Sequence, residues 1–129
     1  GLVAALTKQV AVLRARYNLT VEADLGEEPH IPIEMKHALY RIAQEALHNI
    51  VKHARASMVI LRLAGEANEI ILEVRDNGRG FDPAGSFPGH LGLRSMHERA
   101  TKVGGTLTME SLQGQGALVE VRLPVVLGS

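Results

Sequence analysis

The stretch from residue 41 to residue 54 reads RIAQEALHNIVKHA, and most of it lies in a longer segment, Ile33 to His53, that contains no Gly or Pro. The absence of both helix breakers predicts one long helix. Successive residues of an α-helix are about 100° apart, and this spacing gathers the apolar side chains into one broad stripe that faces the core. The stripe consists of Leu39, Ile42, Ala43, Ala46, Leu47 and Ile50.

Three polar residues, Glu45, Asn49 and His53, follow one another at a spacing of four and border this stripe. The simpler interpretation is a solvated flank of a surface helix. The alternative is that a carboxylate, an amide oxygen and a base line a pocket beside the core. Asn49 would then offer the kind of oxygen ligand that Mg²⁺ prefers. Lys52, one turn on, would reach a phosphate as a mobile point charge.

The remaining segments alternate between helical and strand patterns. We expect further helices at 2–17 and 93–103, the latter ended by Gly104-Gly105, and strands at 19–25, 57–63, 69–75, 106–111 and 117–123. A Gly- and Pro-rich stretch from Asp76 to Gly92 interrupts this order, and long irregular loops in compact domains are usually functional or disordered. The order of elements predicts an α+β fold, an α/β sandwich of two layers with a mixed, mostly antiparallel sheet.

The irregular stretch opens with Asp76-Asn-Gly-Arg-Gly80, directly after a predicted strand. Asn-Gly alone favours a tight hairpin turn, but the residues that follow, Phe81-Asp-Pro83, cannot form the returning strand. Gly78 and Gly80 instead permit a positive φ and the close approach of a flat ligand. Asp76 is then an acceptor for an exocyclic amine at the bottom of that gap.

A second glycine motif, Gly89-His90-Leu91-Gly92-Leu93, opens the next predicted helix. Glycines before a helix expose backbone N–H groups at the positive end of its dipole, which is a ready site for phosphate. A simple flexible turn explains the same residues equally well. This motif therefore carries little weight alone.

Composition limits the class of function. Lys+Arg and Asp+Glu balance at 14 each, so the chain lacks the basic surface of a nucleic-acid or membrane-surface binder. The chain has no Cys, which excludes disulfides and thiolate chemistry and fits a reducing cytosol. No apolar run approaches the roughly 18 residues of a membrane span, so a cytoplasmic domain is expected, which a longer protein can still anchor to a membrane. No histidines form the helical i, i+4 pair of a transition-metal site.

Together, the three motifs resemble those of the GHKL superfamily of ATPases, which includes gyrase, mismatch-repair ATPases and histidine kinases. Residues 41–54 resemble its N box, Asp76–Phe81 its G1 box and Gly89–Gly92 its G2 box. QEAxxNxxKHA at 44–54 with GLxxMxERA at 92–100 looks like the histidine kinases that pair with NarL-type response regulators. The resemblance covers essentially the whole chain and implies the ATP-binding catalytic domain of a sensor histidine kinase, with a Bergerat-type fold and a mobile lid at about 81–91.

The resemblance also implies residue roles. Asp76 is expected to recognise the adenine amine, and Asn49 to bind Mg²⁺. Glu45 is expected either to assist proton removal from an incoming histidine or to orient a Mg²⁺-bound water, and these two roles are equally plausible. The residues expected to contact ATP are Asn49, Lys52, His53, Asp76, Gly78, Gly80, His90, Leu91, Gly92 and Leu93.

Two departures from the family pattern stand out. The acceptor helix of the family places His before an acidic residue, and the only such pair here, His97-Glu98, lies in the helix after the third motif. The expected partner is therefore a separate dimerisation domain that carries the histidine, and indirectly a NarL-type response regulator. In addition, the family's Gly-x-Gly-Thr reads Gly114-Gln-Gly116-Ala117 here, so a hydroxyl contact to the nucleotide is missing or water-mediated. A nucleotide-binding module without transfer activity, or a serine kinase of the anti-sigma type, are the alternatives.

Overall fold

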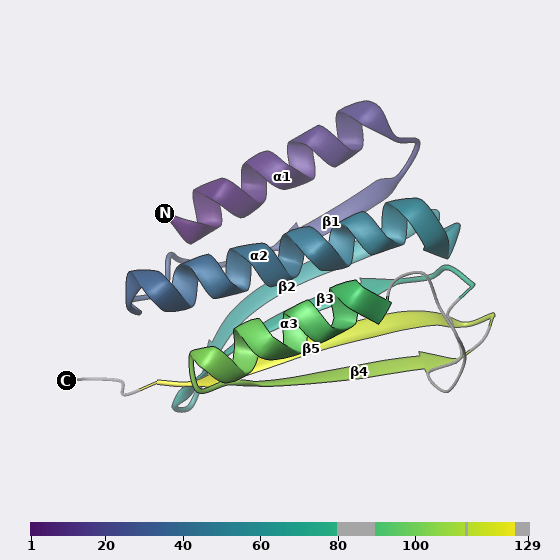
Figure 1. Cartoon of the computed structure of the whole chain (residues 1–129). Coiled ribbons are helices and arrows are strands. Elements are labelled where there is room, and N and C mark those ends of the chain that lie inside the picture. The colour runs from purple at the N-terminus through teal and green to yellow at the C-terminus, as the bar shows by residue number, and fades with distance from the viewer. Residues whose placement is uncertain (80–89, 113, 126–129) are drawn as a thin grey trace.

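Three helices pack on one face of a five-stranded sheet in the computed structural model, which describes residues 1–79, 90–112 and 114–125 (Figure 1). The helices are α1 (Leu2–Arg16), α2 (Ile33–Asn49), which continues into the π-helical turn η1 (Ile50–Ala54), and α3 (His90–Lys102). The strands are β1 (Thr20–Asp24), β2 (Met58–Glu66), β3 (Glu69–Asp76), β4 (Thr106–Leu112) and β5 (Gly116–Pro124). The predicted two-layer α+β architecture is confirmed.

The strands lie in the order β1-β2-β3-β5-β4. The β1–β2 pair is parallel and the other three pairs are antiparallel, which confirms the predicted mixed, mostly antiparallel sheet. In the central pair, Asp76 at the end of β3 is opposite Ala117 at the start of β5. The loop after β3 and the hairpin before β5 are therefore neighbours.

Helix α2 lies at the centre of the helical layer, and its predicted apolar stripe is buried as expected. Leu39, Ile42 and Ala43 have no exposed surface. The stripe shares one hydrophobic core with inward-facing side chains of the central strands, including Leu61 and Val121. No helix within the described residues is long and apolar enough to cross a membrane.

Two helix boundaries differ from the prediction. The long helix was expected to run uninterrupted to His53, but its last turn is π-helical and ends at Arg55, which has φ 52°. Helix α3 was expected to begin at about Leu93 and begins at His90. Gly92 is therefore inside the first turn instead of before it. Its N–H still belongs to the first four donors of the helix, which have no partner within the helix.

Helix α1 is attached to the rest of the domain by Glu28, in the loop after β1. Its carboxylate accepts the backbone N–H groups of Leu2 and Val3, both at 2.7 Å, and pairs with the Lys36 ammonium at 2.7 Å. Desolvation opposes the charge, but the hydrogen bonds and Lys36 outweigh it and lower the pKa of Glu28 to about 2. Glu28 thus links the start of α1 to α2.

Candidate functional site

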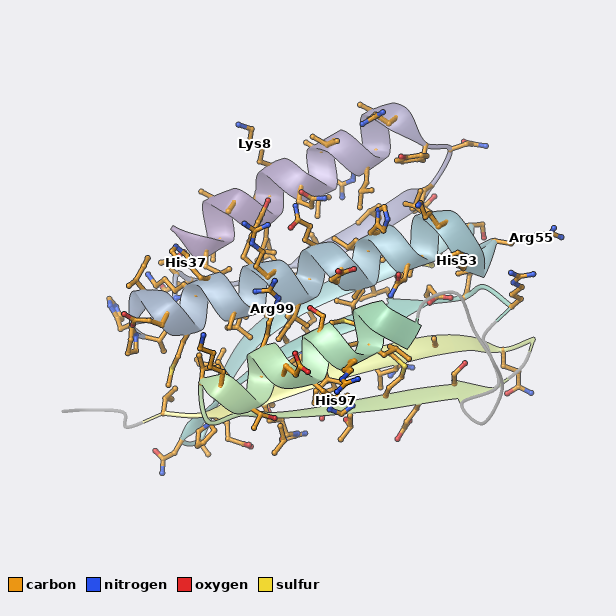
Figure 2. All side chains as sticks on the ribbon, in the orientation of Figure 1. Lys8, His37, His53, Arg55, His97 and Arg99 are labelled. Atoms are coloured by element: carbon orange, nitrogen blue, oxygen red, sulfur yellow. The ribbon has the colours of Figure 1, made fainter. Side chains whose placement is uncertain are left out.

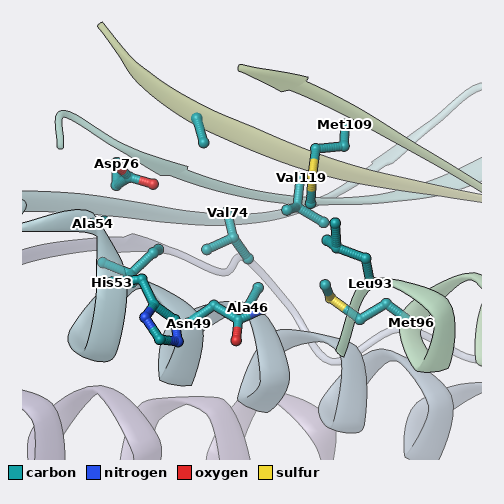
Figure 3. A pocket seen from close by; sticks show the side chains of 12 residues that line it. Ala46, Asn49, His53, Ala54, Val74, Asp76, Leu93, Met96, Met109 and Val119 are labelled. Atoms are coloured by element: carbon teal, nitrogen blue, oxygen red, sulfur yellow. The ribbon is translucent and has the colours of Figure 1, made fainter. Parts of the chain in front are cut away.

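A cavity lies between α2, α3 and the sheet, at the end where β3 finishes (Figure 3). Its volume is about 50 Å³, which is smaller than the roughly 300–1,000 Å³ typical of small-molecule sites. Its walls are mostly apolar with a few polar groups, as such sites require. The lining residues are Ala46, Asn49, Ile50, His53, Ala54, Val74, Asp76, Leu93, Met96, Met109, Ala117 and Val119.

Asp76 is at one end of the cavity, and Leu93 and Met96 are at the other (Figure 3). Asp76 is 7% exposed, and no other charged residue in the described part of the chain is buried to this degree. Burial raises the pKa of its carboxyl group, although the backbone N–H groups of Gly78, at 2.7 Å, and Ala117 act in the opposite direction. Burying a carboxylate at the end of a cavity costs folding free energy, and such groups are typical of binding sites.

Asn49 and His53 line the side of the cavity formed by the end of α2 (Figure 3). The π-helical turn explains why Ala54 joins them there. Residues five apart on an α-helix point about 140° away from each other, whereas the i→i+5 hydrogen bonds of a π-helix bring such residues close to one line. The turn thus directs Asn49 and Ala54 to the same wall.

Gly78 is beside this helix end, not in contact with the cavity. A Cβ on Gly78 would overlap the backbone oxygen of Ala54 and lie 2.8 Å from the Ala54 Cβ. Gly78 does not use the positive φ that a glycine permits, because it is not among the glycines with that conformation. The glycine is required by close packing of the loop on η1. Gly80 lies outside the described residues.

The hairpin before β5 packs equally closely on the other side of the loop. Gly116 has φ 91°, and a Cβ there would overlap the backbone oxygen of Asp76. Ala117 follows it and lines the cavity beside Asp76. The position at which the family often has a threonine thus faces the cavity, and in this chain it offers a methyl group.

Besides Gly78, two more of the predicted residues do not line the cavity. Glu45 is half-buried and lines a separate hollow on the seam between α2 and α3, together with Arg41, Gln44, His48 and Arg99. Lys52 is exposed on η1. The structure therefore unites Asn49, His53, Asp76 and Leu93, and leaves Glu45 about one helical turn away.

The third motif is described only in part. His90, Leu91 and Gly92 form the first turn of α3, and their side chains lie outside the described residues. The predicted lid at about 81–91 also lies outside them, except for the start of this helix. His97 is exposed on the outward side of α3 (Figure 2), and Glu98 pairs with Arg94 at 3.3 Å.

Sequence patterns also held signals for lining residues that were not predicted. Val74 is two residues before Asp76 on β3, and Val119 is two residues after Ala117 on β5. Alternate residues of a strand share a face, so Val74 is expected on the same wall as Asp76, and Val119 on the same wall as Ala117. Met96 lies within the motif at 92–100, one turn after Gly92. Met109 lies outside the motifs, so only the fold brings it there.

The comparisons with known proteins identify the family and support the fold. Residues 34–127 match the family model described as histidine kinase-, DNA gyrase B-, and HSP90-like ATPase. The chain is 34% identical over 125 residues to the sensor histidine kinase LiaS of Bacillus subtilis, covering 97% of this chain and 34% of the relative. It is 30% identical over 126 residues to the histidine-protein kinase/phosphatase DegS of Brevibacillus brevis, covering 97% and 33%.

Among solved structures, the chain is similar to the histidine kinase domain of the blue-light-activated histidine kinase from Erythrobacter litoralis. The TM-score is 0.81 at 24% identity, with 96% of this chain and 60% of that chain covered. This likeness concerns the fold. The chain spans about a third of the length of the curated relatives it matches. With a matched family model over most of its length and sensor histidine kinases as relatives, the chain belongs to the histidine kinase-, DNA gyrase B- and HSP90-like ATPase family.

Proposed function

We propose that this domain binds ATP with Mg²⁺ in the cavity and donates the γ-phosphoryl group to a histidine on a separate dimerisation domain. The observation that carries the proposal is the buried carboxylate of Asp76 at the end of an apolar cavity. An adenine ring is flat and largely apolar, and its exocyclic amine is a donor. Asp76 accepts from this amine, while Val74, Met96 and Met109 contact the faces of the ring.

The phosphates extend toward the helical wall. Asn49 provides a neutral oxygen ligand for Mg²⁺, which when bound neutralises charge on the phosphate oxygens. His53 on the wall and Lys52 at the rim contact the phosphates. The free N–H groups in the first turn of α3, including that of Gly92, add the positive end of a helix dipole.

The transfer breaks the bond between the γ-phosphorus and the β–γ bridging oxygen and forms a bond from phosphorus to an imidazole nitrogen of the partner. ADP leaves with the bridging oxygen. Glu45 lies one turn before Asn49, in the separate hollow between α2 and α3, and there it can take up the imidazole proton or orient a metal-bound water. Transfer of this kind depends on positioning and charge neutralisation, so few protein groups are required. Downstream, a NarL-type response regulator receives the phosphoryl group.

The test mixes this domain with the histidine-bearing dimerisation segment of the same protein, Mg²⁺ and ATP labelled in the γ-phosphate. We expect acid-labile label on the histidine of the partner, and none when Asn49 is replaced by Ala. Tight ATP binding without any label on the partner would instead identify a nucleotide-binding module without transfer activity.

A further inference from the structure

The π-helical end of α2 is held by Arg79, a residue to which the sequence motifs assign no role. The backbone N–H of Arg79 donates to the oxygen of Ala54 at 2.7 Å. Its guanidinium Nε donates to the backbone oxygen of His53, also at 2.7 Å. One residue therefore satisfies two carbonyl groups that the end of a helix leaves without a partner inside the helix.

The loop that carries Arg79 is itself fixed on both sides. The side-chain oxygen of Asn77 accepts the backbone N–H groups of Ser57 and Met58, both at 2.9 Å. The backbone oxygen of Arg79 accepts the N–H of Gly114. The start of β2 and the β4–β5 hairpin thus hold the backbone of this loop in place. From there the guanidinium of Arg79 reaches the carbonyl of His53.

π-Helical turns are rare, and where they occur they often mark functional sites. In this chain the turn brings Ala54 to the cavity wall, beside Asn49 and His53. We propose that Arg79 is a positioning residue for the phosphate end of the nucleotide. By holding the carbonyl of His53 it fixes the position of this helix end, and so keeps the side chain of His53 on the cavity wall beside Asn49. This inference rests on the proposed function, and Arg79 itself needs no contact with the nucleotide.

Arg79→Ala removes the guanidinium donor but keeps the backbone N–H, so the loop stays attached to Ala54. The helix end loses one of the two hydrogen bonds by which Arg79 holds it. We expect the affinity for ATP with Mg²⁺ to fall about tenfold. This is the equivalent of one hydrogen bond to a charged group, here the contact of His53 with a phosphate. The affinity for adenosine should change less than about twofold, because adenosine has no phosphates and depends mainly on Asp76.

Two further variants control for stability and charge. Arg79→Lys keeps a charged donor that can reach the same carbonyl, and it should restore most of the ATP affinity. Arg75→Ala removes an exposed positive charge on the opposite face of β3, and it should bind ATP and adenosine like the wild type. The imidazole NMR resonances of His53 in the nucleotide-free domain should shift in Arg79→Ala and return in Arg79→Lys.

Titration calorimetry with adenosine and with Mg·ATP, together with thermal unfolding, separates the outcomes. A selective loss of ATP affinity with a shifted His53 resonance supports the positioning role. Equal losses for both ligands with a lower melting temperature would overturn it, since Arg79 would then be merely structural. Unchanged ATP affinity and an unchanged His53 resonance would overturn it as well. A wild-type domain that binds no ATP contradicts the proposed function, and the inference falls with it.

Discussion

Replacing Asp76 by Asn should move nucleotide affinity and folding stability in opposite directions. The Asn side chain keeps the volume and one acceptor oxygen, so it can still accept the N–H of Gly78. The Asn side chain has no charge. Its amide group also carries two N–H donors, which conflict with the adenine amine because that amine is a donor too. The loss of a hydrogen bond to a charged group costs about 1.5–3 kcal/mol, so ATP should bind roughly 10- to 150-fold more weakly.

The stability of the free domain should stay the same or rise in Asp76→Asn. Burial raises the pKa of this carboxyl group despite the two backbone N–H donors. The folded state therefore binds a proton more readily than the unfolded state, and stability declines as the pH rises from the ordinary aspartate pKa through the raised one. Above that window the ionised carboxylate is a constant cost to folding, which the amide does not carry.

Calorimetry with ATP and urea denaturation at pH 7 measure both quantities, and Asp24→Asn on the exposed edge of β1 serves as the matched control. The affinity of the wild type for adenosine, which has no titrating phosphates, should fall as the pH is lowered through the raised pKa of Asp76. In Asp76→Asn this fall should be absent. An Asp76→Asn domain that is less stable and binds ATP as tightly as the wild type would refute the adenine site.

Three further substitutions test the packing around the site. Ala117→Thr should tighten ATP binding several-fold through a new hydroxyl contact, whereas Ala117→Val, of the same shape, should not; calorimetry on the pair decides this. Gly78→Ala should cost about 1–3 kcal/mol of unfolding free energy by overpacking against η1, while Gly65→Ala, whose Cβ would lie 3.6 Å from its nearest neighbour, serves as control. Glu28→Gln should lower the free energy of unfolding by about 1 kcal/mol at pH 7, as the loss of a helix cap does. This difference from the wild type should disappear as the pH falls from 4.5 toward 2. Urea denaturation at several pH values measures it.

Periodicity predicted the elements because it reports which side of each element is buried. The stripe from Leu39 to Ile50 needs a core on one side, and the alternation in β3 directs Val74 and Asp76 to one face. The spacing of four between Asn49 and His53 placed both on one wall, as the structure has them. The same spacing also put Glu45 on that line, but Glu45 faces the hollow near Arg99 instead.

The remaining features depend on contacts between segments that are distant in sequence, which a local pattern does not report. A 3.6-residue period cannot reveal a π-helical turn, because the turn is a departure from that period supported by Arg79, twenty-five residues beyond Ala54. For the same reason the sequence could not show that Gly78 is needed for close packing instead of for the positive φ that a glycine permits. Its neighbour across the loop, Ala54, leaves no room for a side chain.

These contacts change what the motifs can be taken to prove. Gly78 and Gly116 are required by the close packing of three backbone segments, η1, the loop after β3 and the β4–β5 hairpin. A domain that had lost its ligand would still need both glycines in order to fold. The case for a nucleotide therefore rests on side chains that folding does not need. Asp76 is the strongest of these, because its burial is a cost to folding that its two backbone N–H donors offset only in part. For this reason a substitution at Asp76 discriminates between a working site and an inherited fold, whereas a substitution at either glycine does not.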